Sequence, residues 1–217
     1  MILVPNGHFD ASTGKLQFTV GHFSSYGAGY HAPSFTDIGK SFAQSDIIYL
    51  SARNVIGGVS ADRFEPKSQL TRADFTLLLA RMSGEQLGGY ATDRFTDVAK
   101  TAYYAQSVAW AADKGIVGGI SEGKFAPGDS ITREQMAVML VRFAALAGLK
   151  LPEQASSVTF ADQAKISAFA SDAVRTVQQA GFMNGKELAG SRYFAPQDHT
   201  TREEAAKLLA SFMKLLA

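Results

Sequence analysis

The hydrophobic pattern of this chain is mainly helical, and it predicts helices in pairs. Three strongly apolar stretches each follow a threonine, at residues 75–80, 136–141 and 205–210. We expect them to form helices that end near Gly84, near Gly148 and at the chain terminus. A shorter helix is predicted ahead of each one, and the best example covers about residues 102–114.

The segment between two paired helices reads as an ordered loop. Gly115 follows the helix predicted at 102–114 and suits the left-handed conformation that often ends helices. Pro127 prevents a helix in the loop. The next helix begins at Thr132, which forms a capping-box pattern with Gln135. Each unit therefore reads helix, loop, helix.

Residues 1–33 follow a different pattern. Lys15–Val20 alternates polar and apolar positions, and Asn6-Gly7 and Thr13-Gly14 are turn sequences. We interpret this segment as a β-hairpin that forms the end of an upstream domain. A two-stranded hairpin is marginally stable alone, so it must pack on the rest of the chain or fray.

The helix pairs belong to a threefold repeat with a period of about 60 to 70 residues. We place its copies at residues 34–90 (repeat 1), 91–152 (repeat 2) and 153–217 (repeat 3). Each copy contains Phe-x-Asp, a glycine or asparagine followed by glycine, Phe-x-Pro and Thr-Arg. The recurring residues are the aspartates Asp37, Asp97 and Asp162, the glycines Gly58, Gly119 and Gly185, and the arginines Arg72, Arg133 and Arg202. One helix pair cannot bury its apolar face alone, so the predicted fold is mainly α, with three pairs in a pseudo-threefold bundle.

Composition narrows the class of protein. Apolar residues make up 46% and charged residues 19%, as in globular proteins, and the net charge of +1 argues against a nucleic-acid-binding protein. The absence of cysteine excludes disulfides and thiolate zinc sites. No apolar run is long enough to insert into a membrane, and the N-terminus does not resemble a signal peptide. We therefore expect a cytosolic protein or a piece of a longer exported one.

The three arginines occupy the first helical position, where a cation is mildly unfavourable because the helix N-terminus is already positive. Their recurrence suggests an anion nearby, and a guanidinium beside free helix N–H groups would bind a carboxylate or phosphate. The alternative is that each arginine pairs with Asp37, Asp97 or Asp162. Both can hold, if the aspartate orients the arginine and part of the guanidinium stays free.

Other candidates are weaker. The glycines Gly58, Gly119 and Gly185 either provide positive φ or let a ligand approach the backbone, and the first reading is favoured. Basic residues precede this turn in two repeats (Arg53 and Lys114). Trp110 and the Tyr103-Tyr104 pair are core residues by default, although an aromatic at a groove edge would suit stacking on a sugar. The histidines (His8, His22, His31 and His199) lack metal spacing, Gly27-Ala-Gly29 is not a dinucleotide fingerprint, and no catalytic constellation is present. We predict no enzyme activity, cofactor or metal.

These motifs resemble those of the S-layer homology (SLH) family, over about residues 34–217. The resemblance rests on Phe-x-Asp, Gly115-Ile-Val-Gly-Gly119, Phe-x-Pro and Thr-Arg-[Ala/Glu]-[Asp/Gln/Glu], repeated in order. It implies a three-pronged, pseudo-threefold helical unit with ligand grooves between the prongs. Repeat 1 lacks the usual glycine before Val55, so its first helix is expected to end differently. Repeat 3 has Asn184, a longer loop and Thr200, and its groove is expected to be the most altered.

The function implied by the resemblance is non-covalent anchoring in the cell wall or S-layer of a Gram-positive bacterium. The ligand implied is a secondary cell wall polymer, recognised through pyruvylated N-acetylmannosamine, whose ketal carries a carboxylate. The signature arginine is the family's key contact, so the expected ligand-binding set is centred on Arg72, Arg133 and Arg202. The set also includes Asp37, Asp97, Asp162, Gly58, Gly119, Gly185, Arg53, Lys114 and Trp110. The alternative is a structural or lattice module without a sugar ligand.

Overall fold

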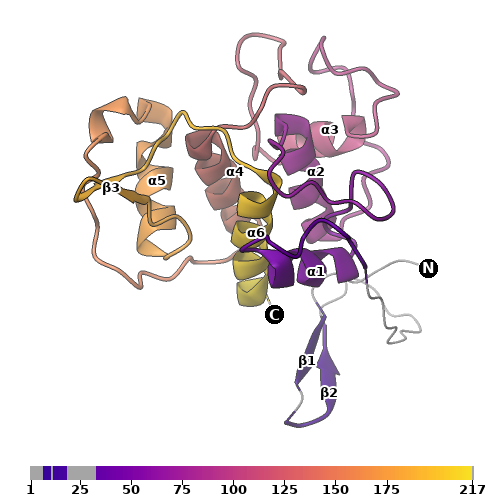
Figure 1. The fold of residues 1–217 in the computed structure, drawn as a ribbon. Helices are drawn as coiled ribbons and strands as arrows, with labels where there is room; N and C mark the ends of the chain where they lie inside the picture. The colour runs from indigo at the N-terminus through magenta and orange to yellow at the C-terminus, as the bar shows by residue number, and fades with distance from the viewer. Residues whose placement is uncertain (1–6, 11, 19–32, 217) are drawn as a thin grey trace. The chain divides into compact units, whose positions relative to one another are not determined.

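The fold was derived from a computed structural model, which describes residues 7–10, 12–18 and 33–216. The expectations for His22, His31 and Gly27-Ala-Gly29, and for the His8 side chain, lie outside the described part. Among the described residues the chain is mainly α, with six α-helices and two short hairpins, so the predicted fold class is confirmed (Figure 1). No helix in this part of the chain is long and apolar enough to cross a membrane.

Each repeat contributes two α-helices in the predicted order. The helices are α1 (Gln44–Ala52), α2 (Arg72–Ser83), α3 (Ala105–Asp113), α4 (Arg133–Leu146), α5 (Ser171–Gln179) and α6 (Arg202–Leu216). Two 3₁₀ turns precede α5, η1 (Gln163–Lys165) and η2 (Ala168–Ala170). The helix predicted at about 102–114 is α3, which begins three residues later because the preceding segment forms turns.

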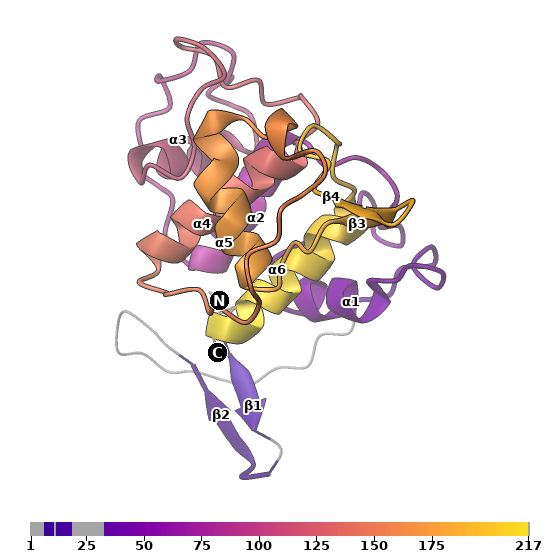
Figure 2. The same ribbon diagram turned by 90° about the vertical axis from the view of Figure 1, so that its left-hand side faces the viewer.

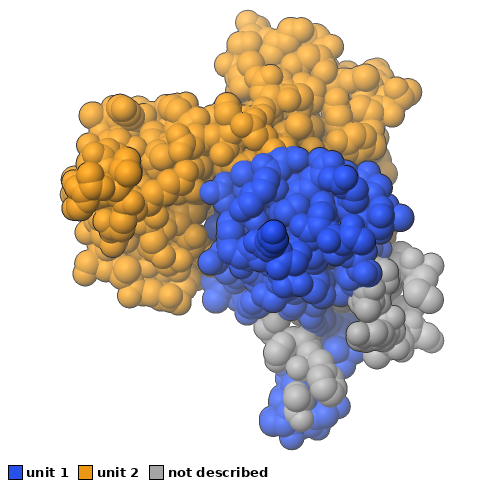
Figure 3. Space-filling view, viewed as in Figure 1, with its two compact units in different colours: residues 1–68, 81–85, 201–217 blue, residues 69–80, 86–200 orange. Residues whose placement is uncertain are grey.

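The chain divides into two compact units (Figure 3). Unit 1 comprises residues 1–68, 81–85 and 201–217, and in it α1 and α6 lie side by side (Figures 1 and 2). Unit 2 comprises residues 69–80 and 86–200, and in it α4 packs on α5. Phe64 and Phe212 are fully buried in unit 1, as are Trp110, Phe125 and Leu140 in unit 2.

Helix ends follow the sequence signals closely. Gly115 has φ +70° after α3, as predicted. The expectation that α1 would end differently is wrong, because Asn54 takes the same left-handed position with φ +56°. Asparagine tolerates this region better than other non-glycine residues. The capping box of Thr132 and Gln135 is also present at the start of α4.

The predicted N-terminal hairpin is confirmed. Strands β1 (His8–Asp10) and β2 (Lys15–Gln17) pair antiparallel, with Phe9 opposite Leu16. The guanidinium of Arg53 stacks on the Tyr49 ring and donates to the Gly7 carbonyl oxygen, 3.3 Å away. Arg53 therefore ties the hairpin segment to α1, and its side chain is engaged in internal contacts. A second hairpin, β3 (Lys186–Leu188) with β4 (Ser191–Tyr193), occupies the longer loop of repeat 3.

Candidate functional site

The recurring aspartates organise the Phe-x-Pro loops of their own repeats. Asp37 accepts hydrogen bonds from the backbone N–H groups of Phe64 and Glu65, at 2.9 and 2.8 Å. Asp97 and Asp162 bind the equivalent N–H pairs in repeats 2 and 3. The pKa of Asp37 is lowered, mainly by the Phe64 N–H. Desolvation raises the pKa of Asp97, but the bonds from Phe125 and Ala126 outweigh it and the net shift is downward.

The middle residue of each Phe-x-Pro loop adopts a left-handed conformation without being glycine. The φ values are +57° at Glu65, +59° at Ala126 and +55° at Ala195. Such a conformation costs roughly 1–2 kcal/mol for an L-residue. It aims two successive N–H groups at one carboxylate, which compensates for the strain.

Each signature arginine contacts the loop of another repeat. Nε of Arg72 donates to the Phe125 carbonyl oxygen at 3.0 Å, and its guanidinium lies 4.8 Å from the centre of the Phe125 ring. Arg133 contacts Phe194 in the same way, at 2.9 and 5.2 Å. Arg202 contacts Phe64, at 2.8 and 4.5 Å. The bonds therefore run from repeat 1 to 2, from 2 to 3, and from 3 to 1.

The same loops also satisfy the N-termini of the signature helices. The N–H groups of Arg72 and Ala73 donate to the carbonyl oxygens of Asp129 and Pro127, and N–H groups of α4 and α6 make the equivalent bonds. The third N–H of each helix donates to its capping threonine. The expectation of a free helix N-terminus as an anion receptor is therefore wrong, because these donors are already bonded.

The alternative expectation, a direct ion pair between aspartate and arginine, does not describe these contacts either. The carboxylate of Asp97 holds the N–H of Phe125, and the carbonyl of Phe125 receives Arg72. The aspartate therefore orients the arginine through the loop backbone. Carbonyl oxygens with partial negative charge explain why a cation is tolerated at the first position of each helix.

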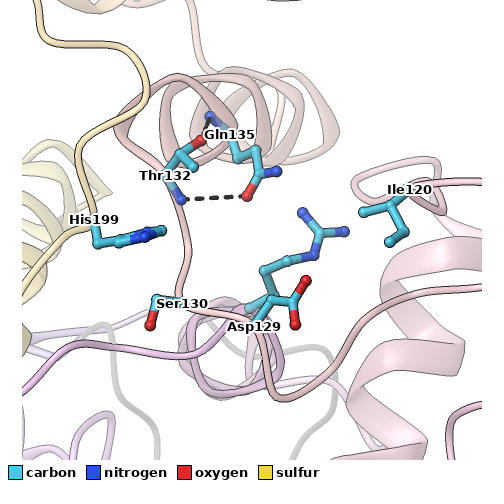
Figure 4. A pocket seen from close by; sticks show the side chains of 7 residues that line it. Ile120, Asp129, Ser130, Thr132, Gln135 and His199 are labelled. Atoms are coloured by element: carbon cyan, nitrogen blue, oxygen red, sulfur yellow. Dashed lines mark hydrogen bonds between the residues drawn. The ribbon is translucent and has the colours of Figure 1, made fainter.

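Arg72 also lines a pocket of about 350 Å³ in unit 2 (Figure 4). The other lining residues are Ile120, Asp129, Ser130, Thr132, Gln135 and His199. Arg72 is only 6% exposed, and burial lowers its pKa more than the attraction of Asp129 and Asp97 raises it. Nε and Nη2 bind Phe125 and Gly118, whereas Nη1 has no hydrogen-bond partner among the described residues.

The pocket combines few but complementary groups. Nη1 of Arg72 suits an anionic or carbonyl oxygen. In the capping box the Thr132 hydroxyl accepts from the Gln135 backbone N–H, and the side-chain oxygen of Gln135 accepts from the Thr132 backbone N–H, so the amide NH₂ of Gln135 is not used there (Figure 4). Ile120 offers an exposed apolar surface, and Asp129 disfavours an anion at its own end of the pocket. A ligand with one negative group and a polar hydroxylated ring matches this distribution.

Asp129, Ser130 and His199 were not among the residues predicted to bind. They lie between Phe-x-Pro and Thr-Arg, a stretch whose spacing suggested only a turn. Asp129 has a counterpart in Asp198 of repeat 3, but repeat 1 has Ser68 there, and Ser130 corresponds to Gln69 and His199, so the sequence carried little signal for these positions.

The recurring glycines have a different role from the one expected. Gly185 has φ +81°, as the turn reading predicted, but Gly58 and Gly119 do not lie in the positive-φ region. A Cβ on Gly119 would lie 2.5 Å from the Lys124 carbonyl oxygen, and one on Gly58 would clash with the Ser60 carbonyl oxygen. At Gly58 and Gly119 the space on the Cβ side is therefore already filled by carbonyl oxygens and a phenylalanine ring of the same repeat.

The predicted ligand contact at Trp110 is wrong. Trp110 is completely buried and packs edge-on against Phe143, so no sugar can stack on it. Lys114 lies at the end of α3, near Asp113 and the Tyr90 ring, and does not line the pocket. Tyr103 is 70% exposed, and its hydroxyl donates to Asp74 at 2.6 Å.

Fold and site together define a module of three helix-loop-helix repeats whose arginines and loops interlock in a fixed order. The model of the S-layer homology domain matches residues 34–76, 94–137 and 159–206. This chain therefore belongs to the S-layer homology family, whose domains are cell-wall anchoring modules and are not catalytic. The expected location, extracellular in the cell wall or S-layer of a Gram-positive bacterium, is supported by this membership.

The relatives are much longer proteins. Over 96% of its length the chain is 32% identical to an amylopullulanase of Thermoanaerobacterium thermosulfurigenes, and over 82% it is 37% identical to an endoglucanase of Bacillus sp. (strain KSM-635). It is 25% identical over 81% of its length to the surface-layer 125 kDa protein of Lysinibacillus sphaericus. The matches span 11%, 18% and 14% of these relatives.

Proposed function

We propose that this chain anchors a larger surface protein non-covalently by binding a secondary cell wall polymer through pyruvylated N-acetylmannosamine. The observation that carries the proposal is Nη1 of Arg72, which has no hydrogen-bond partner in the described part of the chain and lines a pocket of about 350 Å³. A pyruvate ketal presents a carboxylate to such a donor, and the sugar hydroxyls suit the polar lining. Arg133 and Arg202, which contact the equivalent loops, are proposed as the ligand contacts of the other two repeats.

Several weak sites would act together on a polymer. Once one groove is occupied, the next ligand group on the same chain is held at a high effective concentration. Strong anchoring therefore does not require a tight single site. The activity of the larger protein would reside outside this chain, since its relatives include an amylopullulanase and an endoglucanase that it matches only in small part.

The test is calorimetric titration with a pyruvylated N-acetylmannosamine glycan and with the same glycan lacking the ketal. We expect binding of the pyruvylated form and at least tenfold weaker binding of the other. Arg72→Ala should weaken binding. Arg142→Ala is the matched control, because it also removes an arginine N–H from a backbone carbonyl (Ile116, 3.4 Å) but does not line the pocket.

Both variants are compared well below their melting temperatures, since Arg72 also supports the fold. Equal affinity for the two glycans would contradict the ketal as the recognised group. Absence of binding to either would favour the second candidate, a structural or lattice module. The observation favouring that candidate is the commitment of Nε in all three arginines to loop carbonyl oxygens.

A further inference from the structure

Each repeat exposes one aromatic side chain two residues before its first long helix. Phe42 is 56% exposed before α1, Tyr103 is 70% exposed before α3 and Phe169 is 62% exposed before α5. The equivalence was not evident from the motifs, because the spacing from Phe-x-Asp differs between repeats. An aromatic exposed three times at one structural position is not explained by core packing.

All three aromatics lie beside the start of a signature helix. Ser41, the neighbour of Phe42, donates to Glu203 of α6 at 2.7 Å. Tyr103 itself donates to Asp74 of α2. Near Phe169, the backbone N–H and hydroxyl of Ser167 bind Glu134 of α4, at 3.0 and 2.8 Å. Each aromatic is thus placed next to the helix end that carries the arginine.

The Phe42 position in unit 1 has an additional feature, a pair of cations. Nζ of Lys67 and Nζ of Lys207 each lie 5.4 Å from the centre of the Phe42 ring. Lys67 also pairs with the buried carboxylate of Glu203, whereas Lys207 has no acidic partner among the described residues. One positive charge beside the ring is therefore not neutralised.

The other two repeats lack these cations. The position of Lys67, directly after Phe-x-Pro, is Gly128 in repeat 2 and Gln197 in repeat 3. The position of Lys207, five residues after the signature arginine, is Leu77 in repeat 1 and Val138 in repeat 2. The three aromatic positions are consequently unequal in charge, and only the one at Phe42 combines a ring with two lysines.

We propose that Phe42, Lys67 and Lys207 form a separate subsite for an acidic sugar residue of the wall polymer. The apolar C–H face of the sugar packs on the exposed Phe42 ring. Its anionic substituent lies at Nζ of Lys207, with Lys67 as the second cation. This inference rests on the proposed function, since it adds a subsite for the same polymer in unit 1, whereas the Arg72 pocket lies in unit 2.

The chemistry favours a charged sugar over a neutral one. An exposed ion pair between the Lys207 ammonium and an anionic substituent contributes up to about 1 kcal/mol, which corresponds to up to about fivefold in affinity, and a neutral sugar lacks this contribution. An anionic substituent gains attraction to two side chains that can turn toward it while they stay near the ring. The attraction must weaken with salt, because the Debye length falls from about 10 Å at 0.1 M to about 3 Å at 1 M.

The test follows the backbone amide signals of the ¹⁵N-labelled chain during titration with the pyruvylated N-acetylmannosamine glycan. We expect saturable shifts at Phe42 and Lys207, smaller shifts with the glycan lacking the ketal, and none with inorganic phosphate alone. Lys207→Gln should raise the glycan concentration at the midpoint of the Phe42 shift two- to fivefold at low salt. In 1 M salt the difference between variant and wild type should be smaller. Phe42→Ala should abolish the shift at Lys207.

Two controls accompany these variants. Phe169→Ala removes a similarly exposed ring, at which the positions equivalent to Lys67 and Lys207 are not occupied by lysine. Lys150→Gln removes an exposed lysine outside the proposed subsite. Neither variant should change the midpoint of the shift at Phe42. If Ile120 and other pocket signals shift but Phe42 and Lys207 do not, the subsite is refuted and the anchoring function stands. If no signal shifts with the glycan, both proposals fail.

Discussion

Thr200 is a fully buried polar residue of unit 2. A closed cycle of backbone hydrogen bonds joins Leu70 to Thr200, Thr200 to Ile131 and Ile131 to Leu70, at 2.9, 3.1 and 2.9 Å. All three residues are buried. The Thr200 hydroxyl has no hydrogen-bond partner among the described residues, whereas the equivalent residues of the other repeats are aliphatic.

Thr200→Val should therefore stabilise the protein. Valine has the shape of threonine and leaves the three backbone bonds intact, while it removes a hydroxyl whose unpaired burial costs about 1–3 kcal/mol. We expect the free energy of unfolding to rise by about 1–2 kcal/mol. For a chain of this size that corresponds to an increase of about 2–4 °C in the melting temperature.

The assay is thermal and urea denaturation followed by circular dichroism, with Thr132→Val as the matched control. The same chemical change at Thr132 removes the helix cap that accepts the Gln135 N–H, so it should destabilise by about 0.5–2 kcal/mol. If Thr200→Val is neutral or destabilising, the hydroxyl has a favourable interaction and the reasoning about an unpaired buried group is refuted.

Further predictions concern the loops. Gly119→Ala should destabilise the protein by about 1–3 kcal/mol, because the new Cβ would meet a carbonyl oxygen. Gly118→Ala is the control, since a Cβ there meets open space, and it should change stability by less than about 0.5 kcal/mol. Urea denaturation measures both. Ala126→Gly should relieve the left-handed strain and stabilise by up to about 1 kcal/mol, and a loss of stability would contradict the strain argument. Because Asp37 and Asp97 have lowered pKa values when folded, they stabilise the protein at neutral pH, and this contribution should be lost as pH falls below about 3.9 and through the lower folded values. Melting temperatures measured from pH 6 to pH 2 test this, and a flat profile would contradict it.

The helices and their ends were predictable because their signals are local. The capping box at Thr132 and the left-handed Gly115 depend on residues within one or two turns of the helix. The repeat then supplied the rest of the fold class, since three like helix pairs need a common partner. The termination of α1 was missed because Asn54 substitutes for glycine with a different residue type.

The site was predicted less well because its main partners are backbone atoms. The carbonyl oxygens that receive the signature arginines have no side-chain signature, so the sequence suggested either a ligand or the aspartates. Direct pairing with the aspartates was one of the alternatives left open, but the aspartates reach the arginines only through the Phe-x-Pro backbone. Burial of Trp110 and the restricted space at Gly119 depend on tertiary packing that motif spacing does not report.

The bond from Arg202 to Phe64 has a consequence for how the chain reaches its native state. Its partners are 138 positions apart, so the loop of repeat 1 receives its arginine only after repeat 3 has been synthesised. Non-local contacts of this kind slow folding and leave early segments incomplete while the chain emerges. A repeat array with open ends tolerates gain or loss of a copy, but here deletion of one copy would leave a Phe carbonyl without its donor. Selection should therefore preserve the number of repeats at three.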